Sequence, residues 1–113
     1  MNSVSLIGNL ATEVEVKDIG EEKKVATFLL AVDRRGRDAG ADFVNVSTWD
    51  RQAEICGEYL AKGGRIGVEG RLRSRSWEDA EGKRRSAVEV VAHRIEFLDS
   101  RSREEAPFEA VAS

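Results

Sequence analysis

One helix-like segment, in a chain that otherwise consists of strand-like segments, constrains the fold of this sequence more than any other feature. Residues 50–62 carry apolar side chains at spacings of three and four, which places them on one face of a helix. The side chains on that face are Ala53, Cys56, Tyr59 and Leu60, with Ile55 at its edge. Asp50 is the expected N-cap, and Gly63-Gly64 the expected end of the helix. The sequence therefore predicts a single helix with strands on both sides of it.

The remaining periodic segments have the alternation or the short apolar runs of β-strands. These segments are residues 3–10, a continuation at 13–17 after a kink, 24–33, 42–49, 65–77 and 84–98. Turns or loops are expected at 18–22, 34–41 and 78–83, where glycines and charged residues gather. Three strands, one helix and two strands match an all-β, five-stranded Greek-key barrel, the oligonucleotide/oligosaccharide-binding (OB) fold, with its helix between the third and fourth strands. We expect this domain over residues 1–99, and a short, acidic, disordered tail over 100–113.

The strand at 65–77 carries a pattern that points to a ligand. Successive side chains of a strand alternate between its faces, so Arg71, Arg73, Arg75 and Trp77 share one face. Guanidinium groups suit phosphates, and a flat indole ring suits stacking under a base. The alternative for this stretch alone is a solvated strand. With the other signals of the chain, the pattern indicates a surface for a nucleic-acid strand.

The strand at 42–49 carries aromatic side chains on the face opposite its valines. Val44 and Val46 point to one face, which is the expected core face. Phe43 and Trp49 point to the other, together with polar side chains. Large aromatics on a polar strand face are unusual for simple packing. A bulge would reverse this assignment, because a shift of one residue moves every side chain to the other face.

Basic residues are segregated into clusters, although the net charge of the chain is −3. The last ten residues hold three acids and no base, and without them 18 acids balance 18 bases. The candidate phosphate contacts are Arg34, Arg35, Arg37, Lys62, Arg71, Arg73, Arg75, Arg84 and Arg85. We therefore expect binding through a local basic surface and not through the field of the whole molecule.

No pattern in the sequence indicates catalysis, a metal site or a cofactor. His93 is the only histidine and Cys56 the only cysteine, too few to build a tetrahedral zinc site alone. No Ser/His/Asp or Cys/His arrangement for nucleophilic catalysis is supported in this setting. Cys56 lies on the apolar helix face, which predicts a buried, unreactive thiol. No apolar run approaches the roughly 18 residues of a membrane span. No signal peptide is visible, and a single cysteine fits a reducing compartment, so we expect a cytoplasmic, non-enzymatic protein.

Several ordered motifs resemble those of bacterial single-stranded DNA-binding proteins. The resemblance covers residues 1 to about 98, and the match at 68–79, Val-Glu-Gly-Arg-Leu-Arg-Ser-Arg-Ser-Trp-Glu-Asp, is its most specific part. The other motifs are residues 6–10, 28–32, Asp42-Phe43 with Trp49, 59–63 and 88–92.

The resemblance implies an OB-fold subunit that binds single-stranded DNA with little sequence preference. It also implies a homotetramer built from dimers, a place at the nucleoid, and roles in DNA replication, recombination and repair. The stacking aromatics of the family correspond to Phe43, Trp49 and Trp77. The loop after the second strand, where the family often has a further aromatic, has only arginines here, at 34, 35 and 37.

The C-terminal segment differs from the family pattern. Glu104, Glu105, Pro107 and Phe108 resemble the acidic tip through which the family recruits replication and repair proteins. Five residues follow Phe108, so this phenylalanine lacks the terminal carboxylate that a partner pocket would capture.

Two alternatives to DNA binding stay open at this point. One is a protein-interaction module on an OB-fold, such as a primosome-like or tetramer-modulating paralogue with weak DNA binding. The other is RNA binding on the same fold, because a stacking groove alone does not distinguish the two nucleic acids.

Overall fold

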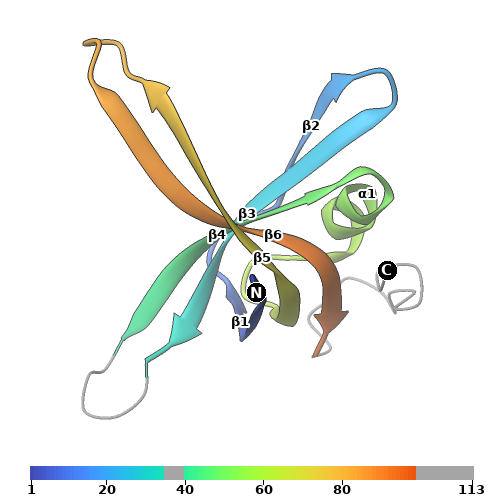
Figure 1. Cartoon of the computed structure of the whole chain (residues 1–113). Coiled ribbons are helices and arrows are strands. Elements are labelled where there is room, and N and C mark those ends of the chain that lie inside the picture. The colour runs from blue at the N-terminus through green and yellow to red at the C-terminus, as the bar shows by residue number, and fades with distance from the viewer. Residues whose placement is uncertain (35–39, 99–113) are drawn as a thin grey trace.

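The computed structural model describes residues 1–34 and 40–98 (Figure 1). Six strands and one helix follow one another along the chain. They are β1 (Val4–Leu10), β2 (Glu15–Gly20), β3 (Lys23–Asp33), β4 (Ala41–Trp49), α1 (Asp50–Tyr59), β5 (Arg65–Glu78) and β6 (Arg84–Phe97). No helix in the described part of the chain is long and apolar enough to cross a membrane.

The strands form one sheet that curls into a ring, which confirms the all-β OB-fold. The strand order is β1-β5-β6-β4-β3-β2, and a further pairing of β1 with β3 closes the ring. β4 and β6 run parallel, and the other pairs are antiparallel. The sheet is not a clean barrel, because the β2–β3, β3–β4 and β5–β6 hairpins continue beyond the ring as three arms (Figure 1).

The first strand of the expected barrel is interrupted, as the sequence pattern indicated. β1 and β2 both run antiparallel to β3, with Asn9 opposite Ala31 and Glu15 opposite Thr27. The interruption raises the strand count from five to six, so α1 lies between β4 and β5. The expected turn at 18–22 is shorter than predicted, because β2 continues to Gly20. Only Glu21 and Glu22 turn the chain, with Glu22 in the left-handed region at φ 54°.

The helix is shorter than predicted, and its cap differs. α1 begins at Asp50 and ends at Tyr59, and the residue in the N-cap position is Trp49, without a side-chain cap hydrogen bond. Asp50 has φ 55°, and its carboxylate instead accepts a hydrogen bond from the Lys24 backbone N–H at 3.4 Å. The helix stops before Gly63 because Leu60 takes an extended conformation, with ψ 142°, and enters the core.

The core lies inside the ring and under the helix. Its largest fully buried apolar side chains are Leu30, Val46, Cys56, Ile66, Val68, Val90 and Ile95. The register between β3 and β4 runs without a shift from Ala41 to Trp49, so no bulge reverses the faces of β4. Val46 is buried and Phe43 is 62% exposed, which confirms the predicted inner and outer faces.

A bulge in β6 lies next to Gly70 of β5 and sets the register of the β5–β6 arm. Glu69 pairs with Arg94 and Gly70 with Ala92, so His93 is the extra residue. A Cβ atom at Gly70 would overlap the carbonyl oxygen of Val91, so only glycine allows the two strands to approach this closely. Beyond the bulge, regular pairing continues to Glu78 opposite Arg84.

Candidate nucleic-acid interface

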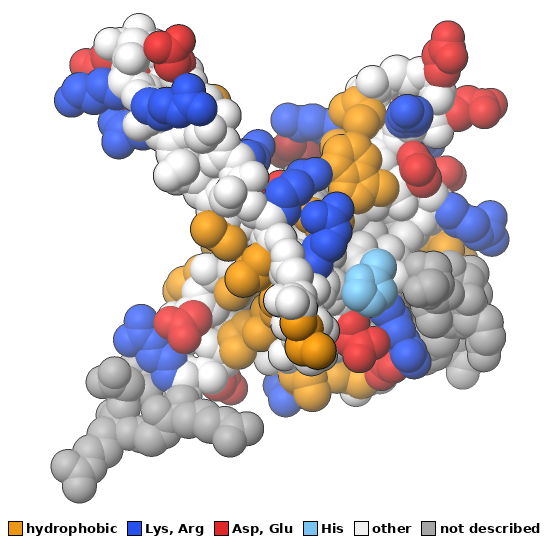
Figure 2. Space-filling model, in the orientation of Figure 1, with side chains coloured by type: hydrophobic (Ala, Val, Ile, Leu, Met, Phe, Trp, Pro, Cys, Tyr) orange, Lys and Arg blue, Asp and Glu red, His pale blue; other side chains and the backbone are white. Residues whose placement is uncertain are grey.

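A small recess lies on the outer face of the sheet, between the β5–β6 arm and the β2–β3 arm. Its volume is about 230 Å³, and five strands contribute to its lining. The lining residues are Lys17, Val25, Thr27, Ser47, Trp49, Arg73, Arg75 and Glu89. Figure 2 shows basic and hydrophobic side chains next to each other where these two arms diverge. The recess therefore combines an aromatic ring with charged groups at the centre of the predicted binding face.

Trp49 and Arg73 meet in this recess, although they are distant in the sequence. The guanidinium carbon of Arg73 lies 5.8 Å from the centre of the Trp49 ring, within the range of a cation–π contact. Arg73 Nη2 also donates a hydrogen bond of 2.6 Å to Oε1 of Glu89, the residue directly opposite in β6. Ser47 lies on the same face of β4, and its buried hydroxyl has no hydrogen-bond partner in the described part of the chain.

Trp77 extends the same face towards the tip of the β5–β6 arm. Its side chain is 43% exposed, and the Arg75 guanidinium carbon lies 5.2 Å from its ring centre. Arg85 is its cross-strand neighbour. Trp77 is four positions beyond Arg73, which corresponds to about 13 Å along a strand. The arm therefore presents a second, more exposed aromatic platform with its own cation.

Phe43 lies on the same face of β4 as Trp49, at the other end of the strand. The two residues are six positions apart, or about 20 Å along the strand. The three predicted aromatics thus follow one outer face, and the structure places each of them within reach of solvent.

The predicted basic residues differ in whether their charge is already paired. Within the described residues, Arg71 and Arg75 have no carboxylate partner. Ion pairs join Arg34 to Asp42 at 2.9 Å, Arg73 to Glu89 at 2.6 Å and Arg85 to Asp79 at 2.8 Å.

Four predicted basic residues remain: Lys62, Arg84, Arg35 and Arg37. Arg84 donates a hydrogen bond to the Ser76 hydroxyl, and Lys62 lies in the turn after the helix, where its backbone N–H donates to Glu13 Oε1. Arg35 and Arg37 lie outside the described residues, as does the tail motif of Glu104, Glu105, Pro107 and Phe108.

Sequence reasoning missed five residues of the recess: Lys17, Val25, Thr27, Ser47 and Glu89. Glu89 shares a face with Arg73 only because β5 and β6 pair in one particular register, which alternation within a single strand does not reveal. Lys17 was visible as the end of an alternating run, but nothing in that run showed that it lies beside β3. Pairing between strands was the missing signal.

Two titratable groups have shifted pKa values with clear causes. The backbone N–H of Lys83, the Arg85 side chain and the backbone N–H of Glu81 lower the pKa of Asp79. Burial raises the pKa of Cys56 to about 12, in agreement with the predicted unreactive thiol. The described residues contain no group of histidine, cysteine and acidic side chains suited to holding a metal ion.

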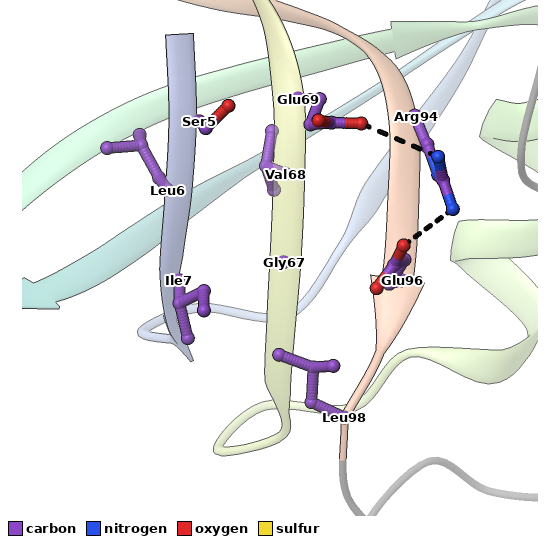
Figure 3. A pocket seen from close by; sticks show the side chains of 9 residues that line it. All are labelled: Ser5, Leu6, Ile7, Gly67, Val68, Glu69, Arg94, Glu96 and Leu98. Atoms are coloured by element: carbon purple, nitrogen blue, oxygen red, sulfur yellow. Dashed lines mark ion pairs between the residues drawn. The ribbon is translucent and has the colours of Figure 1, made fainter.

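A second, more apolar groove lies on the outer face of β1, β5 and β6 (Figure 3). Its volume is about 290 Å³. Ile7 and Leu98 are its exposed apolar side chains, and Arg94 bridges Glu69 at 3.8 Å and Glu96 at 2.7 Å on its floor. None of the three aromatics lines it, so this groove is distinct from the aromatic face.

Exposed aromatics and unpaired arginines along one face of an OB-fold are typical of proteins that bind single-stranded nucleic acid by stacking and charge. Comparison with known proteins gives the particular family. The model of the single-strand binding protein family matches residues 1–98, and the chain belongs to that family.

Curated relatives agree with this assignment. A single-stranded DNA-binding protein of Clostridium tetani is 46% identical over 103 residues, which cover 88% of this chain and 71% of that protein. A protein of the same name from Streptococcus pneumoniae is 39% identical, over 90% of this chain and 68% of that protein. Single-stranded DNA-binding protein A of Bacillus subtilis is also 39% identical, over 90% of this chain and 62% of that protein.

Proposed function

We propose that this protein binds single-stranded DNA with little sequence preference and protects exposed strands during DNA replication, recombination and repair. One observation carries the proposal. Phe43, Trp49 and Trp77 follow a single outer face, and Arg71 and Arg75 on the same face have no carboxylate partner in the described chain. Family membership and the names of the relatives support the same activity. The protein works in the cytoplasm, at the nucleoid.

The mechanism follows from the geometry of the face. Every base has a flat π surface, so stacking on Trp49 or Trp77 tolerates any sequence, and each stacked base contributes about 1–3 kcal/mol. The sugar-phosphate backbone then lies beside Arg71 and Arg75 of β5, which neutralise phosphates and release counterions. Residues 1–99 form the binding domain, and no step of this mechanism requires catalysis, a metal or a cofactor.

Intrinsic tryptophan fluorescence tests this proposal directly. Trp49 and Trp77 are the only tryptophans, so quenching by an oligo-dT of a few tens of nucleotides would report from the site itself. We expect strong quenching by the single strand and none by duplex DNA. The affinity should fall with salt at a log–log slope of roughly −0.7 per phosphate contact. Absence of both quenching and salt-sensitive retention would contradict DNA binding and favour the interaction module. Stronger binding of oligo-rU than of oligo-dT would favour RNA.

Substitution of a stacking tryptophan tests the same proposal by mutagenesis. Trp77→Ala should weaken binding by about 5- to 140-fold, the equivalent of the 1–3 kcal/mol that a stacked base contributes. Leu72→Ala is the control, because Leu72 is an exposed apolar residue of the same arm but points to its opposite face. Equal losses in both variants would mean that the arm, and not stacking, accounts for the effect.

We also propose that the protein assembles with itself through β1, as a homotetramer built from dimers. In the described chain, β1 pairs with β5 from Val4 to Asn9 but with β3 only at Asn9 and Leu10. The free edge of β1 therefore offers unpaired backbone groups to a second copy, which would remove an exposed strand edge. The apolar groove beside it, with Ile7 and Leu98 (Figure 3), supplies side chains for that copy to cover.

Recruitment of replication and repair proteins by Glu104, Glu105, Pro107 and Phe108 is a separate proposal that rests on sequence alone. Removal of residues 104–113 should abolish co-purification of such partners while oligo-dT binding by residues 1–99 stays unchanged. Loss of DNA binding in the same variant would contradict the proposed division of the chain.

A further inference from the structure

We propose that Glu89 is a positioning residue that holds Arg73 over Trp49, so that Arg73 is part of the stacking platform and makes no phosphate contact. The inference rests on the proposed binding of single-stranded DNA. It assigns a role to an acidic residue at the centre of a surface whose ligand is an anion.

The contacts of Arg73 restrain its guanidinium on two sides. Its Nε and Nη2 atoms both donate to Oε1 of Glu89, at 3.1 and 2.6 Å. The guanidinium carbon lies over the Trp49 ring, 5.8 Å from the centre of that ring. Glu89 is directly opposite Arg73 in the β5–β6 register, so regular strand pairing supports this arrangement. Arg73 therefore links the carboxylate to the indole.

Burial of the carboxylate makes the pair hard to separate. Glu89 is only 8% exposed, whereas most acidic residues of the described chain are exposed. If Arg73 moved away to a phosphate, it would leave a buried negative charge without its cation, which is strongly unfavourable. The same charge would also repel the incoming phosphate. Arg73 is thus expected to stay with Glu89 when DNA binds.

Arg75 provides an internal comparison within the same strand. It also lies over a tryptophan, with its guanidinium carbon 5.2 Å from the centre of the Trp77 ring. Its cross-strand neighbour is Ala87, and no carboxylate pairs with it in the described part of the chain. The two arginine–tryptophan pairs therefore have the same composition but different charge: the one at Trp49 is neutralised, and the one at Trp77 is cationic.

The difference has a measurable consequence for the salt dependence of binding. Only a cation that neutralises a phosphate releases counterions. Each such contact contributes roughly −0.7 to the slope of log affinity against log salt concentration for a single strand. Arg75→Gln should make the slope shallower by about 0.7. The double variant Arg73→Gln/Glu89→Gln removes two paired charges together, so it should weaken binding by the same factor at every salt concentration and leave the slope unchanged. A purely structural role for Glu89 would leave the slope unchanged in its own variants.

Glu89→Gln gives the decisive result. It keeps the shape of the side chain but removes the charge that neutralises Arg73, so Arg73 becomes free to contact a phosphate. We expect the slope to become steeper by about 0.7 relative to the wild-type protein. The double variant Arg73→Gln/Glu89→Gln lacks both charges and should return to the wild-type slope. It also leaves no buried unpaired charge, unlike Arg73→Gln alone.

The experiment is an oligo-dT titration of the full chain by tryptophan fluorescence over a series of salt concentrations, with thermal melting to check folding. A shallower slope in the double variant, together with no change in Glu89→Gln, would overturn the inference and make Arg73 a phosphate contact. DNA binding by the wild-type protein would stand in that case. Absence of binding by the wild-type protein would overturn the proposed function, and this inference with it.

Discussion

The carboxylate of Asp79 organises the tip of the β5–β6 arm, two residues beyond Trp77. Its Oδ1 atom accepts hydrogen bonds from the backbone N–H groups of Glu81 and Lys83, both at 2.9 Å. Its Oδ2 atom accepts one from Arg85 Nε at 2.8 Å. These donors stabilise the charged form and lower the pKa of Asp79, with the Lys83 N–H as the largest cause. One small side chain thereby shapes the turn and orients a cation beside an aromatic platform.

This arrangement predicts a pH dependence of known sign. Because the pKa is lower in the folded state than in the unfolded state, the stabilisation is present above the ordinary aspartate pKa of about 3.9. It is lost as the pH falls through the lowered value. NMR titration of the Asp79 carboxyl carbon should therefore give a midpoint below 3.9, and amide exchange at Glu81 and Lys83 should accelerate in acid. In Asp79→Asn this acid-dependent change should disappear. A midpoint at or above 3.9 would contradict the turn geometry.

The pKa of Cys56 is shifted in the opposite direction to that of Asp79. Burial disfavours the thiolate and raises the pKa to about 12, so the folded protein holds almost no reactive thiolate at pH 8. We expect no reaction with a thiol-specific disulfide reagent at that pH, and one equivalent of reaction once denaturant unfolds the chain. Rapid labelling of the folded protein would show that α1 opens readily from the sheet.

At the scale of single side chains, the sequence predicted correctly which face of a strand a side chain occupies, but not which side chain it pairs with. Alternation alone placed Phe43 outside and Val46 inside, because β4 runs without a bulge. The pairing of Arg73 with Glu89 was not predictable, since it depends on where a second strand lies 16 residues further along the chain. Face assignment is a property of one strand, whereas charge pairing is a property of two.

At the scale of elements, the register of β5 and β6 depends on Gly70. A methyl group there would overlap the Val91 carbonyl, and the strands would have to separate next to the bulge. Gly70→Ala should therefore destabilise the protein by about 1–3 kcal/mol, the usual cost of overpacking. Gly67→Ala is the matched control in the same strand, because its nearest neighbour would be Leu98 Cδ1 at an ordinary 3.7 Å. Urea denaturation of both variants measures the difference, and equal stabilities would show that the strands adjust freely.

Element boundaries followed the sequence where local pattern decides them. The kink between residues 10 and 13 was visible, and both parts of the strand pair with β3 as one continuous strand would. The end of α1 was not visible, because a tertiary contact decides it: Leu60 leaves the helical conformation to enter the core. The bulge at His93 was also missed, since nothing in the local apolar pattern of β6 marks the extra residue.

At the scale of the whole molecule, the arrangement of charge explains how a chain with a net charge of −3 can bind an anion. Acidic residues lie at the tip of the β2–β3 arm (Figure 2), whereas Arg71 and Arg75 of β5 have no carboxylate partner among the described residues. Internal ion pairs neutralise much of the remaining charge, including that of Arg34 and Arg85. Net charge is therefore a poor guide to the ligand, and the number of unpaired cations on one face is a better one.

The proposed self-association also belongs to the scale of the whole molecule, and Ile7 is the residue that tests it. Its side chain is 54% exposed in the groove beside the free edge of β1, where a second copy would cover it. Ile7→Lys would place a charge in the proposed interface, and we expect this variant to form smaller species than the proposed tetramer. Ile19→Lys is the control: Ile19 is 49% exposed, but it lies on β2, away from the groove.

Sedimentation velocity at micromolar concentration separates the outcomes. Wild type and Ile19→Lys should sediment as the tetramer, and Ile7→Lys as a dimer or monomer. Because Phe43, Trp49 and Trp77 all belong to one subunit, a short oligo-dT should still quench the fluorescence of the dissociated variant. A wild-type monomer, or equal masses for the two variants, would contradict assembly through β1. Loss of quenching in Ile7→Lys alone would mean that a neighbouring subunit completes the binding face.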